Sequence, residues 1–418
     1  MLNNVDFIEL GIVDLEGRLK TRTLMNKNIE KILEEGIGFD GSSVNLSDIE
    51  DSDLLAIPDP TTLKIYSSNG HKIAFFLCDV YKDGKPLSYY PRQILKNILK
   101  KKNYKFKAGP EIEFYVKKQN FLRNHEYMNP YPLDEIKPLK RILMKKLDEI
   151  GFDIKLEHHE VGDGQHEITM NYQDALEMAD NIIFYKYYLR IFFKENEKEI
   201  TFMPKPFYWL NGSGMHIHFT LHNNNGENLF SNNGKLTETA LKFIGGILRY
   251  SREITLATNQ TVNSFKRLVP GFEAPIYISW GYGNRSALIR IPKYRKDNIN
   301  RIEVRMPDPL CNPYIAIAAI YIAGLKGLEE NIIPPDPIQE NIYHMKNELE
   351  TLPSNLEEAI KEAERGTILK KLLNNGFTRL LKEKVNEWNN YMKYLKEKNI
   401  SRNTLKITEW EIRQYFYM

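Results

Sequence analysis

The chain has 418 residues, and its 58 Lys and Arg against 55 Asp and Glu leave a formal charge of only +3. Such a balance provides no basic field of the kind that holds nucleic acid or an anionic membrane, so bulk charge identifies no partner. Only two cysteines occur, which excludes a disulfide scaffold and a four-Cys zinc module and is typical of a reducing compartment. The length predicts two or more domains.

The apolar residues are not gathered in a way that favours export or membrane insertion. The N-terminus lacks a basic start followed by an apolar run, so we expect no secretion signal. The most apolar stretch, 313–325, is well short of the ~20 residues that cross a bilayer. We therefore expect a soluble, cytoplasmic protein that binds neither membranes nor nucleic acid.

The first part of the chain predicts a small unit rich in strands. Residues 7–24 are apolar and β-branched at first, break at 14–17 and resume as an alternating strand, which is typical of a hairpin. We expect a short helix over 28–35 and a strand over 73–80. The unit should end near Pro91, where a helix pattern over 92–102 begins.

Beyond that unit, strand and helix patterns alternate irregularly, without the βαβ spacing of a doubly wound sheet, so we predict an α+β architecture. Asn312 and Pro313 are favoured N-cap and first-turn residues for a helix over 312–328. A last helix is expected over 379–398, with an apolar face that packs on the domain or on a neighbouring subunit. The residues of that face are Leu381, Val385, Trp388, Met392 and Leu395.

Three strand-like segments, 111–116, 215–219 and 301–306, place charged or histidine side chains on one face and apolar side chains on the other. In the first segment, Glu111 and Glu113 lie side by side. Any one of these segments alone is explained by a half-buried strand whose polar face lies in water. Adjacent carboxylates repel each other, however, and the repulsion is tolerated most readily when a cation lies between them.

A fourth segment adds two carboxylates, because Glu160 and Glu167 flank a Gly-Asp-Gly turn that can aim both at one point. The candidate ligands are thus mostly glutamate oxygens with one or two imidazoles. Such a set favours Mg²⁺ or Mn²⁺ over Zn²⁺, and sites of this kind usually handle phosphates. Arginines near the same segments suit bidentate contact with carboxylate or phosphate, and together with a divalent metal they indicate phosphoryl transfer. They are Arg267, Arg285, Arg290 and Arg305.

No GxxxxGK[ST] motif occurs, so we do not expect a P-loop. Two glycine-containing loops, 211–214 and 270–275, are both explained as tight turns. The second loop holds a lone glutamate, Glu273, and is equally consistent with a mobile flap. Spacing alone does not decide between these two interpretations.

These segments resemble type I glutamine synthetases over nearly the whole chain. The matching runs are FDGSS (39–43), GPEIEF (109–114), HHEV and GQHEI (158–168), TFMPKP (201–206), NGSGMHIH (211–218), NSFKRLVPGFEAP (263–275), GNRSALIRIP (283–292) and RIEVRMPDPLCNPY (301–314).

The resemblance implies a fold, an assembly and a reaction. The fold is an N-terminal β-grasp domain, which we place at 1–88, and a catalytic domain at 89–418 with a curved antiparallel sheet flanked by helices. The assembly is a homo-oligomer, a dodecamer of two hexameric rings with active sites between subunits. The implied reaction is that of a glutamate–ammonia ligase, which joins L-glutamate to ammonium through γ-glutamyl phosphate and releases ADP and phosphate. ATP is the cosubstrate, with two or three Mg²⁺ or Mn²⁺ ions per subunit.

The resemblance also assigns roles to residues. Glu113, Glu160 and Glu167 match the ligands of the metal nearer glutamate, and Glu111, His216 and Glu303 match those of the metal on the ATP phosphates. Glutamate is held at the positions of Asn211, Gly212, Arg267 and Arg305. The transferring phosphate meets Arg285 and Arg290, and the nucleotide is lined by His218 and Thr220. If both Arg285 and Arg290 contribute, the chain must bend between them, because strict alternation puts them on opposite faces.

The resemblance places the amine site at the FDGSS segment. Asp40 and Ser43 match the positions that bind ammonium and remove its proton, Tyr127 is nominated by its distance along the chain, and Glu273 matches the flap residue that keeps water from the acyl phosphate. The segment 44–51 departs from the usual family pattern. Lys155 and the run Tyr208-Trp209-Leu210 depart from it too.

Two alternatives remain at this point. A related ligase could join glutamate to a larger amine, such as a polyamine or ethanolamine, and the changed 44–51 segment leaves that reading open. A catalytically silent regulatory or structural subunit is the other, although no metal ligand of the family pattern is missing.

Overall fold

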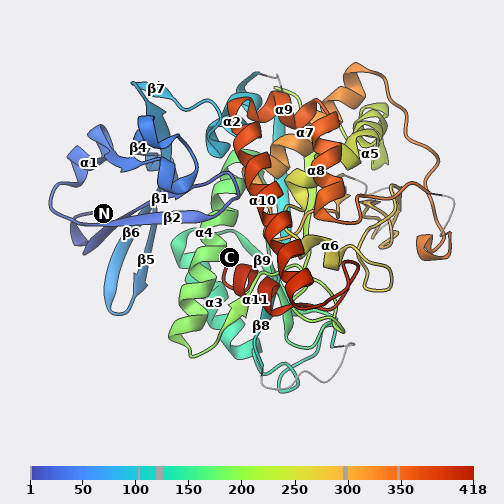
Figure 1. Ribbon diagram of the computed structural model, residues 1–418, viewed down its shortest axis with the longest axis horizontal. Coiled ribbons are helices and arrows are strands. Elements are labelled where there is room, and N and C mark those ends of the chain that lie inside the picture. The colour runs from blue at the N-terminus through green and yellow to red at the C-terminus, as the bar shows by residue number, and fades with distance from the viewer. Residues whose placement is uncertain (1, 102–103, 119–125, 295–299, 346–348) are drawn as a thin grey trace.

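The computed structural model describes residues 2–101, 104–118, 126–294, 300–345 and 349–418 (Figure 1). Its N-terminal part is built around the predicted hairpin, in which β1 (Phe7–Val13) pairs antiparallel with β2 (Leu19–Met25). On its other side β1 pairs parallel with β6 (His71–Lys82), so the first and last long strands of this unit lie together at its centre. The hairpin and the strand expected at 73–80 are therefore confirmed.

The N-terminal sheet has the order β2-β1-β6-β4-β3, and two short strands pair with β6 outside this path. The helix expected at 28–35 is confirmed, beginning one residue later. The remaining elements of this unit are α1 (Ile29–Glu35), β3 (Ile37–Asp40), β4 (Asp53–Pro58), β5 (Lys64–Ser68) and β7 (Lys85–Pro86).

The second sheet carries the segments that alternate charged and apolar residues. Its order is β16-β17-β18-β13-β8-β10-β9, and β11 and β12 pair with β8. All its pairs are antiparallel except β16 with β17. The strands are β8 (Lys105–Val116), β9 (Ile154–His159), β10 (Gln165–Met170), β11 (Gln173–Asp174), β12 (Ile200–Thr201), β13 (Met215–His222), β16 (Trp280–Tyr282), β17 (Ile289–Ile291) and β18 (Ile302–Val304). A separate hairpin joins β14 (Ser231–Asn232) to β15 (Lys235–Leu236).

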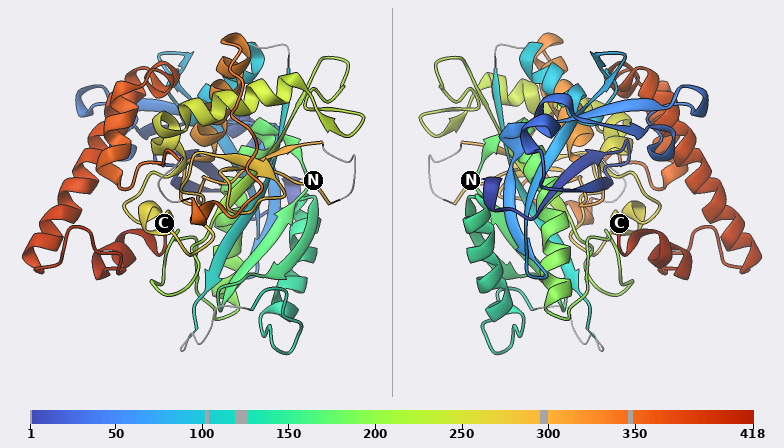
Figure 2. Two further views of the ribbon diagram at one scale, coloured as in Figure 1. Left: turned by 90° about the vertical axis from the view of Figure 1, so that its right-hand side faces the viewer. Right: turned by 90° about the vertical axis from the view of Figure 1, so that its left-hand side faces the viewer.

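Helices follow these strands and bury the apolar face of the sheet in one continuous core. In Figure 1 the N-terminal sheet, drawn in blue, stands to one side of this helical part, and Figure 2 shows α10 and α11 along the far edge of the molecule from β8 and β9. The helices are α2 (Pro91–Lys101), α3 (Lys137–Ile150), α4 (Ala175–Glu195), α5 (Glu238–Thr258), α6 (Ser264–Arg267), α7 (Pro313–Glu329), α8 (Leu356–Arg365), α9 (Ile368–Leu373), α10 (Asn375–Glu397) and α11 (Glu409–Tyr415).

Helix α7 forms as predicted and lies at the centre of this layer. The Asn312 side chain accepts hydrogen bonds from the backbone N–H groups of Tyr314 and Ile315, and Pro313 occupies the first turn. Almost every residue of the helix is buried, which explains why its sequence is apolar on all sides. The Asn312 amide also donates to the carbonyls of Asp14 and Leu15, so the cap connects the two domains.

A buried arginine also joins the two domains. Arg92, on α2, is 1% exposed and meets three aspartates. Its Nε lies 2.9 Å from Asp180 Oδ1, its Nη1 2.6 Å from Asp79 Oδ1 and its Nη2 2.9 Å from Asp59 Oδ2. Lys96, one turn further along α2, lies 2.6 Å from Asp79. The carboxylates come from the loop after β4, from β6 and from α4, so one guanidinium ties three elements together.

Two expectations need correction. The apolar face predicted for the last helix is confirmed in part, since Leu395 is buried and three other members of the face, Leu381, Trp388 and Met392, pack partly buried against the core. Val385 is the exception at 37% exposed, whereas its neighbour Lys384 is wholly buried. Lys384 lies inside because its Nζ is 2.5 Å from Glu16 and 2.8 Å from Glu387, which neutralise it. The buried positions are Gly376, Phe377, Leu380, Lys384, Tyr391 and Leu395.

The second correction concerns the strand expected at 301–306, which is only three residues long as β18. The helix predicted to begin at residue 92 is α2, and the end predicted for it, residue 102, lies outside the described residues. None of the helices in the described part of the chain combines the length and the hydrophobicity that a bilayer crossing needs.

Candidate functional site

The sheet register brings the predicted ligands together. Glu113 on β8 stands opposite Glu167 on β10, and Glu111 stands opposite His216 on β13. Glu303 on β18 follows on the far side of β13, opposite His218. Like charges directly opposite each other in a sheet are destabilising, so this arrangement is not one that strand stability favours.

Glu111, Glu113, Glu167 and His216 line a cavity of about 430 Å³. The cavity walls are supplied by β8, β10 and β13, the turn after β9, and the two glycine-containing loops of the sequence. The predicted site residues that line it are Glu111, Glu113, Tyr127, Glu160, Glu167, Asn211, Gly212, His216, Arg267, Glu273, Arg285 and Arg305. Those that do not line it are Asp40, Ser43, His218, Thr220, Arg290 and Glu303.

One group of candidate metal ligands surrounds His216. Its Nδ1 lies 3.7 Å from Glu111 Oε2, 3.9 Å from Glu113 Oε1 and 3.9 Å from Glu303 Oε1. One ligand atom from each of Glu111, His216 and Glu303 falls within 4.8 Å of the others. The three residues come from three neighbouring strands, and a cation between them would meet two carboxylates and one imidazole.

A second group lies at the turn between β9 and β10. Here Glu160 and Glu167 each offer an oxygen within 4.8 Å of the other and of a His158 ring nitrogen. His158 Nε2 is 2.7 Å from Glu160 Oε1. Glu113, predicted for this metal, is not in the group. Its Oε2 accepts hydrogen bonds from Gln165 Nε2 at 2.9 Å and from the Gly214 N–H at 2.8 Å.

The carboxylates perturb one another strongly. Burial and the charge of Glu160 raise the pKa of Glu113 to about 8. Burial and the charge of Glu111 raise the pKa of Glu167 well above its usual value. Burial lowers the pKa of His216 to about 4, so its ring is neutral and free to act as a ligand. Without metal, part of this negative charge is removed by protons.

The carboxylates of Glu111 and Glu303 are, in contrast, stabilised in their ionised form. Although burial opposes it, the charge of His218 lowers the pKa of Glu111 well below its usual value and lowers that of Glu303 too. Arg305 Nε lies 3.3 Å from Glu303 Oε1, and Arg290 forms an ion pair with the other oxygen. Arg290 is thus paired with Glu303, which it faces in the register, and it does not line the cavity.

The arginines divide into two kinds. Arg267 Nη1 and Nη2 donate to the carbonyls of Met306 and Arg305 at 2.9 and 3.0 Å, which fixes its position. Arg305, in contrast, is 3% exposed and its Nη1 has no hydrogen-bond partner among the described residues. A buried guanidinium with an unused donor beside a cavity is suited to an anionic ligand. Arg285 precedes β17 in a turn, so the chain does bend between it and Arg290.

The second glycine-containing loop closes one side of the cavity. Glu273 has a φ of 58°, which is rare for a residue other than glycine. Asn211 Nδ2 donates to Glu273 Oε2 at 3.3 Å, and Tyr343 donates its hydroxyl to the Ala274 carbonyl at 2.9 Å. The loop is a tight turn, as the first interpretation has it, and its glutamate faces the cavity, as the flap interpretation requires.

The predicted nucleotide residues lie beside the cavity rather than in its wall. His218 Nε2 is 2.8 Å from Glu111 Oε1, so this ring meets a candidate metal ligand. Thr220 is contacted by His222 Nε2 at 3.0 Å. Tyr127 does line the cavity and packs edge-on against His158, with ring centroids 5.3 Å apart.

The predicted amine-site pair lies in the other domain. Ser43 Oγ donates to Asp40 Oδ2 at 2.5 Å, and Ser42 Oγ donates to Oδ1 at 2.7 Å. These hydrogen bonds, that of Ser43 first, lower the pKa of Asp40 to about 2. Asp40 is exposed at the end of β3, and neither it nor Ser43 reaches the cavity of its own chain.

His158 and Gln165, which line the cavity and contact its carboxylates, were not predicted from the sequence. His158 and Glu160 are two positions apart at the end of a strand and therefore share a face, so the period of two was a usable signal for His158. Gln165 bridges Glu113 and the Gly212 carbonyl through its amide. Nothing in its spacing distinguished it from any other polar turn residue.

The fold and the cavity define a two-domain α+β protein whose larger domain holds clustered carboxylates, two groups fit for divalent cations and an arginine with a free donor. A family model described as the glutamine synthetase catalytic domain matches residues 88–415, and one described as the glutamine synthetase β-grasp domain matches residues 4–83.

Full-length relatives agree with these matches. The chain is 41% identical to the glutamine synthetase of Pyrococcus woesei, with 100% of this chain and 98% of that one covered. It is 37% identical to the glutamine synthetase of Thermotoga maritima, with 99% and 97% covered. The chain belongs to the glutamine synthetase family, so the family prediction is confirmed.

Solved structures show the same fold. A structure described as GmaS in complex with ADP matches with a TM-score of 0.88 at 30% identity, over 98% of this chain and 96% of that one. The glutamine synthetase of Plasmodium falciparum, solved by electron cryomicroscopy, matches with a TM-score of 0.85 at 25% identity, over 99% and 96%. The predicted fold, with its β-grasp and catalytic domains, is confirmed.

Proposed function

We propose that the cavity makes L-glutamine from L-glutamate, ammonium and ATP, as a glutamate–ammonia ligase of the type I class. The observation that carries the proposal is the convergence of two cation-binding groups and a free guanidinium donor on one cavity of about 430 Å³. The names of the full-length relatives support the same activity.

The ligand chemistry fits Mg²⁺ or Mn²⁺. Glu111, His216 and Glu303 would hold one ion, and Glu160 and Glu167, joined by Glu113 or His158, would hold the other. The raised pKa of Glu113 supports this fit, because a site that takes up protons to relieve repulsion has room for a cation's charge. When bound, the ions would neutralise the ATP phosphates and polarise the transferring phosphoryl group.

In the first step, an oxygen of the glutamate γ-carboxylate attacks the γ-phosphorus of ATP, the bond to the bridging oxygen breaks, and ADP leaves. Arg305, with its unused Nη1, would bind a carboxylate of glutamate, and Asn211 and Gly212 would fix the rest of the molecule. Arg267 would support this pocket, since its donors already hold the backbone of Arg305 and Met306. Arg285 would meet the transferring phosphoryl group from the cavity rim.

In the second step, after ammonium has given up one proton, the ammonia nitrogen attacks the acyl carbon, the bond from that carbon to the phosphate oxygen breaks, and phosphate leaves as hydrogen phosphate with the second proton that the nitrogen loses. Glu273 would exclude water during this step. The variant Glu273→Ala is then expected to release more phosphate per glutamine formed, because the acyl phosphate hydrolyses. Parallel assays of phosphate and glutamine measure this ratio, and an unchanged ratio would contradict the role.

The ammonium site would be completed by a second subunit. Asp40 and Ser43 do not reach the cavity of their own chain, and the low pKa of Asp40 keeps its carboxylate ionised to hold a cation. We infer that Asp40 of a neighbouring subunit holds ammonium and takes its proton while Tyr127 lines the other side. A dodecamer of two hexameric rings provides such pairs of domains, each site lying between two subunits.

A mixing experiment tests the shared site. Asp40→Ala and Arg305→Ala should each be nearly inactive alone, because one lacks the donated residue and the other the cavity residue. Co-expressed one to one, random assembly should restore about a quarter of the wild-type sites, in which both contributions are intact. If the specific activity of the mixed protein stays at the mean of the two variants measured separately, each chain completes its own site and the proposal is wrong.

The amine decides what the enzyme makes, and the alternative of a larger amine keeps the same first step. The changed segment 44–51 lies next to Ser43 and is the feature that favours it. The test is phosphate release from ATP and glutamate with a panel of ammonium, ethanolamine and polyamines. Turnover with ammonium supports the proposal, and turnover only with another amine would overturn it.

We further propose that the protein works in the cytoplasm with these small molecules, without nucleic acid or membrane, and that its domains divide at residues 88 and 89. All candidate ligands of the family pattern are present, which argues against a silent regulatory subunit.

A further inference from the structure

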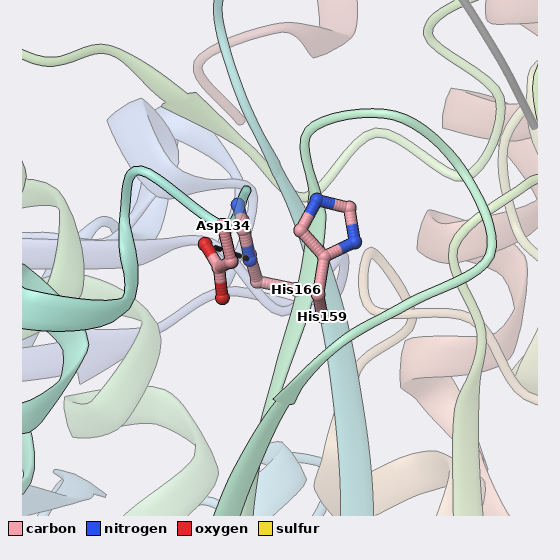
Figure 3. Close-up of side chains that lie close together, drawn as sticks. All are labelled: Asp134, His159 and His166. Atoms are coloured by element: carbon pink, nitrogen blue, oxygen red, sulfur yellow. Dashed lines mark ion pairs between the residues drawn. The ribbon is translucent and has the colours of Figure 1, made fainter. Parts of the chain in front are cut away.

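A second polar cluster lies behind the cavity, on the opposite face of β9 and β10. His159 directly precedes Glu160 and His166 directly precedes Glu167, so the two imidazoles point away from the cavity. They stand opposite each other in the register. Asp134, in the loop before α3, meets them there (Figure 3). All three side chains are at most 2% exposed, and the proposed reaction uses none of them.

The three side chains converge on one point. One ligand atom from each lies within 4.8 Å of the others. His166 Nδ1 is 4.0 Å from Asp134 Oδ1, and the rings of His159 and His166 meet edge to face with centroids 4.5 Å apart. Bonds of about 2.0–2.2 Å to a common ion put ligand atoms roughly 3.5 Å apart, so the side chains need to close by only about 1 Å.

The hydrogen bonds orient these groups as ligands. His159 Nδ1 donates to the Glu160 carbonyl at 2.7 Å, which leaves the lone pair of Nε2 unused. This is the outer contact that metal-bound histidines typically make. The backbone N–H of Ile136 donates to Asp134 Oδ1 at 3.1 Å and fixes the carboxylate.

His166 supplies a separate observation. Its ring is wholly buried, yet neither nitrogen has a hydrogen-bond partner among the described residues. A buried polar group left unpaired costs about 1–3 kcal/mol, so such a group calls for an explanation. A ligand held between the two rings and Asp134 would supply the missing partner.

A buried lysine lies next to the cluster and leaves the coordinating oxygen accessible. Lys140 Nζ is 2.9 Å from Asp134 Oδ2 and 2.5 Å from Glu157 Oε2. Its charge is therefore shared between two carboxylates. Oδ1, the oxygen that faces His166, is not the one it contacts.

We propose that Asp134, His159 and His166 form a structural site for a transition-metal ion, with Zn²⁺ as the ion whose ligand preferences they match. Two imidazoles and one carboxylate suit Zn²⁺ and disfavour Mg²⁺, which prefers oxygen. The ion would tie β9 and β10 to the loop that carries Tyr127. It would thus support, from the opposite face, β10 with Glu167 and the end of β9, which Glu160 directly follows. The inference does not depend on the amine that the enzyme uses.

The test measures how much zinc stays bound to the protein in the presence of excess Mg²⁺. Full-length protein is stripped with a chelator, loaded with Zn²⁺ and dialysed against excess Mg²⁺, and the zinc per chain is then determined by mass spectrometry. The carboxylate-rich cavity should exchange its zinc for Mg²⁺, and the buried site should not. Wild type is expected to keep one zinc per chain more than His166→Asn.

Two matched variants separate the sites. His216→Asn removes an imidazole from the cavity, and His71→Asn removes one from an exposed position. Both should keep the equivalent that His166→Asn loses. Equal retention by His166→Asn and wild type, or loss of that equivalent in His216→Asn instead, would overturn the proposal.

A measurement on the unchanged protein guards against a variant that fails to fold. Co²⁺ added to stripped wild type in excess Mg²⁺ should give a visible absorption band of imidazole-bound Co²⁺ that saturates at one ion per chain, and Zn²⁺ should displace it. If wild type binds neither ion under these conditions, the proposal is wrong.

Discussion

Two clusters of buried acids in this protein are built from the same kind of side chain and differ in what neutralises their charge. At the domain junction, Asp59, Asp79 and Asp180 surround Arg92, which contacts each of them directly. In the cavity, Glu113 and Glu167 face each other across two strands, and neither has an Arg or Lys ion pair among the described residues.

The pKa values of Asp59 and Glu113 show the contrast most clearly, while burial raises the pKa of Asp180 at the junction as well. Despite burial, hydrogen bonds from Thr61 and the charge of Arg92 lower the pKa of Asp59 to about 2. Burial and the charge of Glu160 raise that of Glu113 to about 8. A carboxylate cluster that the chain neutralises itself is structural, and one that it leaves short of positive charge is arranged for a cation from outside.

The largest effect is expected from removing the internal cation. Arg92→Met leaves three aspartates beside Lys96 alone, and breaking a buried ion pair from one side costs about 3–5 kcal/mol. The free energy of unfolding, from urea denaturation in the presence of Mg²⁺, should fall by that amount. The exposed Arg141 is the control, and Arg141→Met should change the value by no more than ~0.5 kcal/mol. Wild-type stability in Arg92→Met would show that the junction does not depend on this pairing.

A carboxylate-to-amide exchange sharpens the comparison, because the same chemical change is made in each cluster. Asp59→Asn should lower the stability of metal-free protein by about 1–2 kcal/mol, since it removes an ionised partner of Arg92. Glu167→Gln should lower it by less, because burial and the charge of Glu111 raise the pKa of Glu167, so the ionised carboxylate that the amide replaces is itself disfavoured in the metal-free protein.

The stabilisation by added Mg²⁺ should distinguish the same two variants in the opposite order, with the larger loss now in Glu167→Gln. Mg²⁺ should raise the melting temperature of Asp59→Asn as it does for wild type, but that of Glu167→Gln by much less, because a ligand is missing. Activity of Glu167→Gln should fall by at least about a hundredfold. Equal responses to Mg²⁺ in both variants would remove Glu167 from the metal site.

The sequence predicted the cavity better than the junction, for a physical reason. Alternation along a strand identifies which face a side chain takes, so a single segment was enough to predict that Glu111 and Glu113 share a face. The family motifs supplied the other ligands. Arg92 is one basic residue in a helix pattern rich in lysine, and its three aspartates come from distant parts of the chain. Only the fold brings them together.

The same reasoning explains the error in α10. Periodicity assumes that buried positions are apolar, and it therefore selected Val385 as part of the buried face rather than its neighbour Lys384. Lys384 is buried because Glu16, from the other domain, and Glu387 neutralise it. A charge buried by pairing carries no signature in its own helix, so such residues have to be found in the structure.

The smallest effect is a dependence of metal affinity on pH, and it follows from the raised pKa of Glu113. Below about pH 8 the metal-free carboxyl of Glu113 holds a proton, which an incoming cation must displace. The apparent Mg²⁺ affinity should therefore rise by up to about tenfold per pH unit from pH 6 and level off above pH 8. Isothermal titration in two buffers of different ionisation enthalpy measures both the affinity and the protons released.

At the domain junction the pKa of Asp59 is lowered rather than raised, so the expected dependence on pH is different. The pKa of Asp59 is lowered to about 2, so its contribution to stability is present above the unfolded value near 3.8 and is lost only as the pH falls toward 2. Between pH 6 and 8 Asp59 exchanges no proton, and the Asp59→Asn variant should show the same pH dependence of Mg²⁺ binding as wild type. An affinity that does not change between pH 6 and 8 in wild type would mean that the cavity carboxylates are already ionised without metal, and the contrast between the two clusters would then lie in their partners alone.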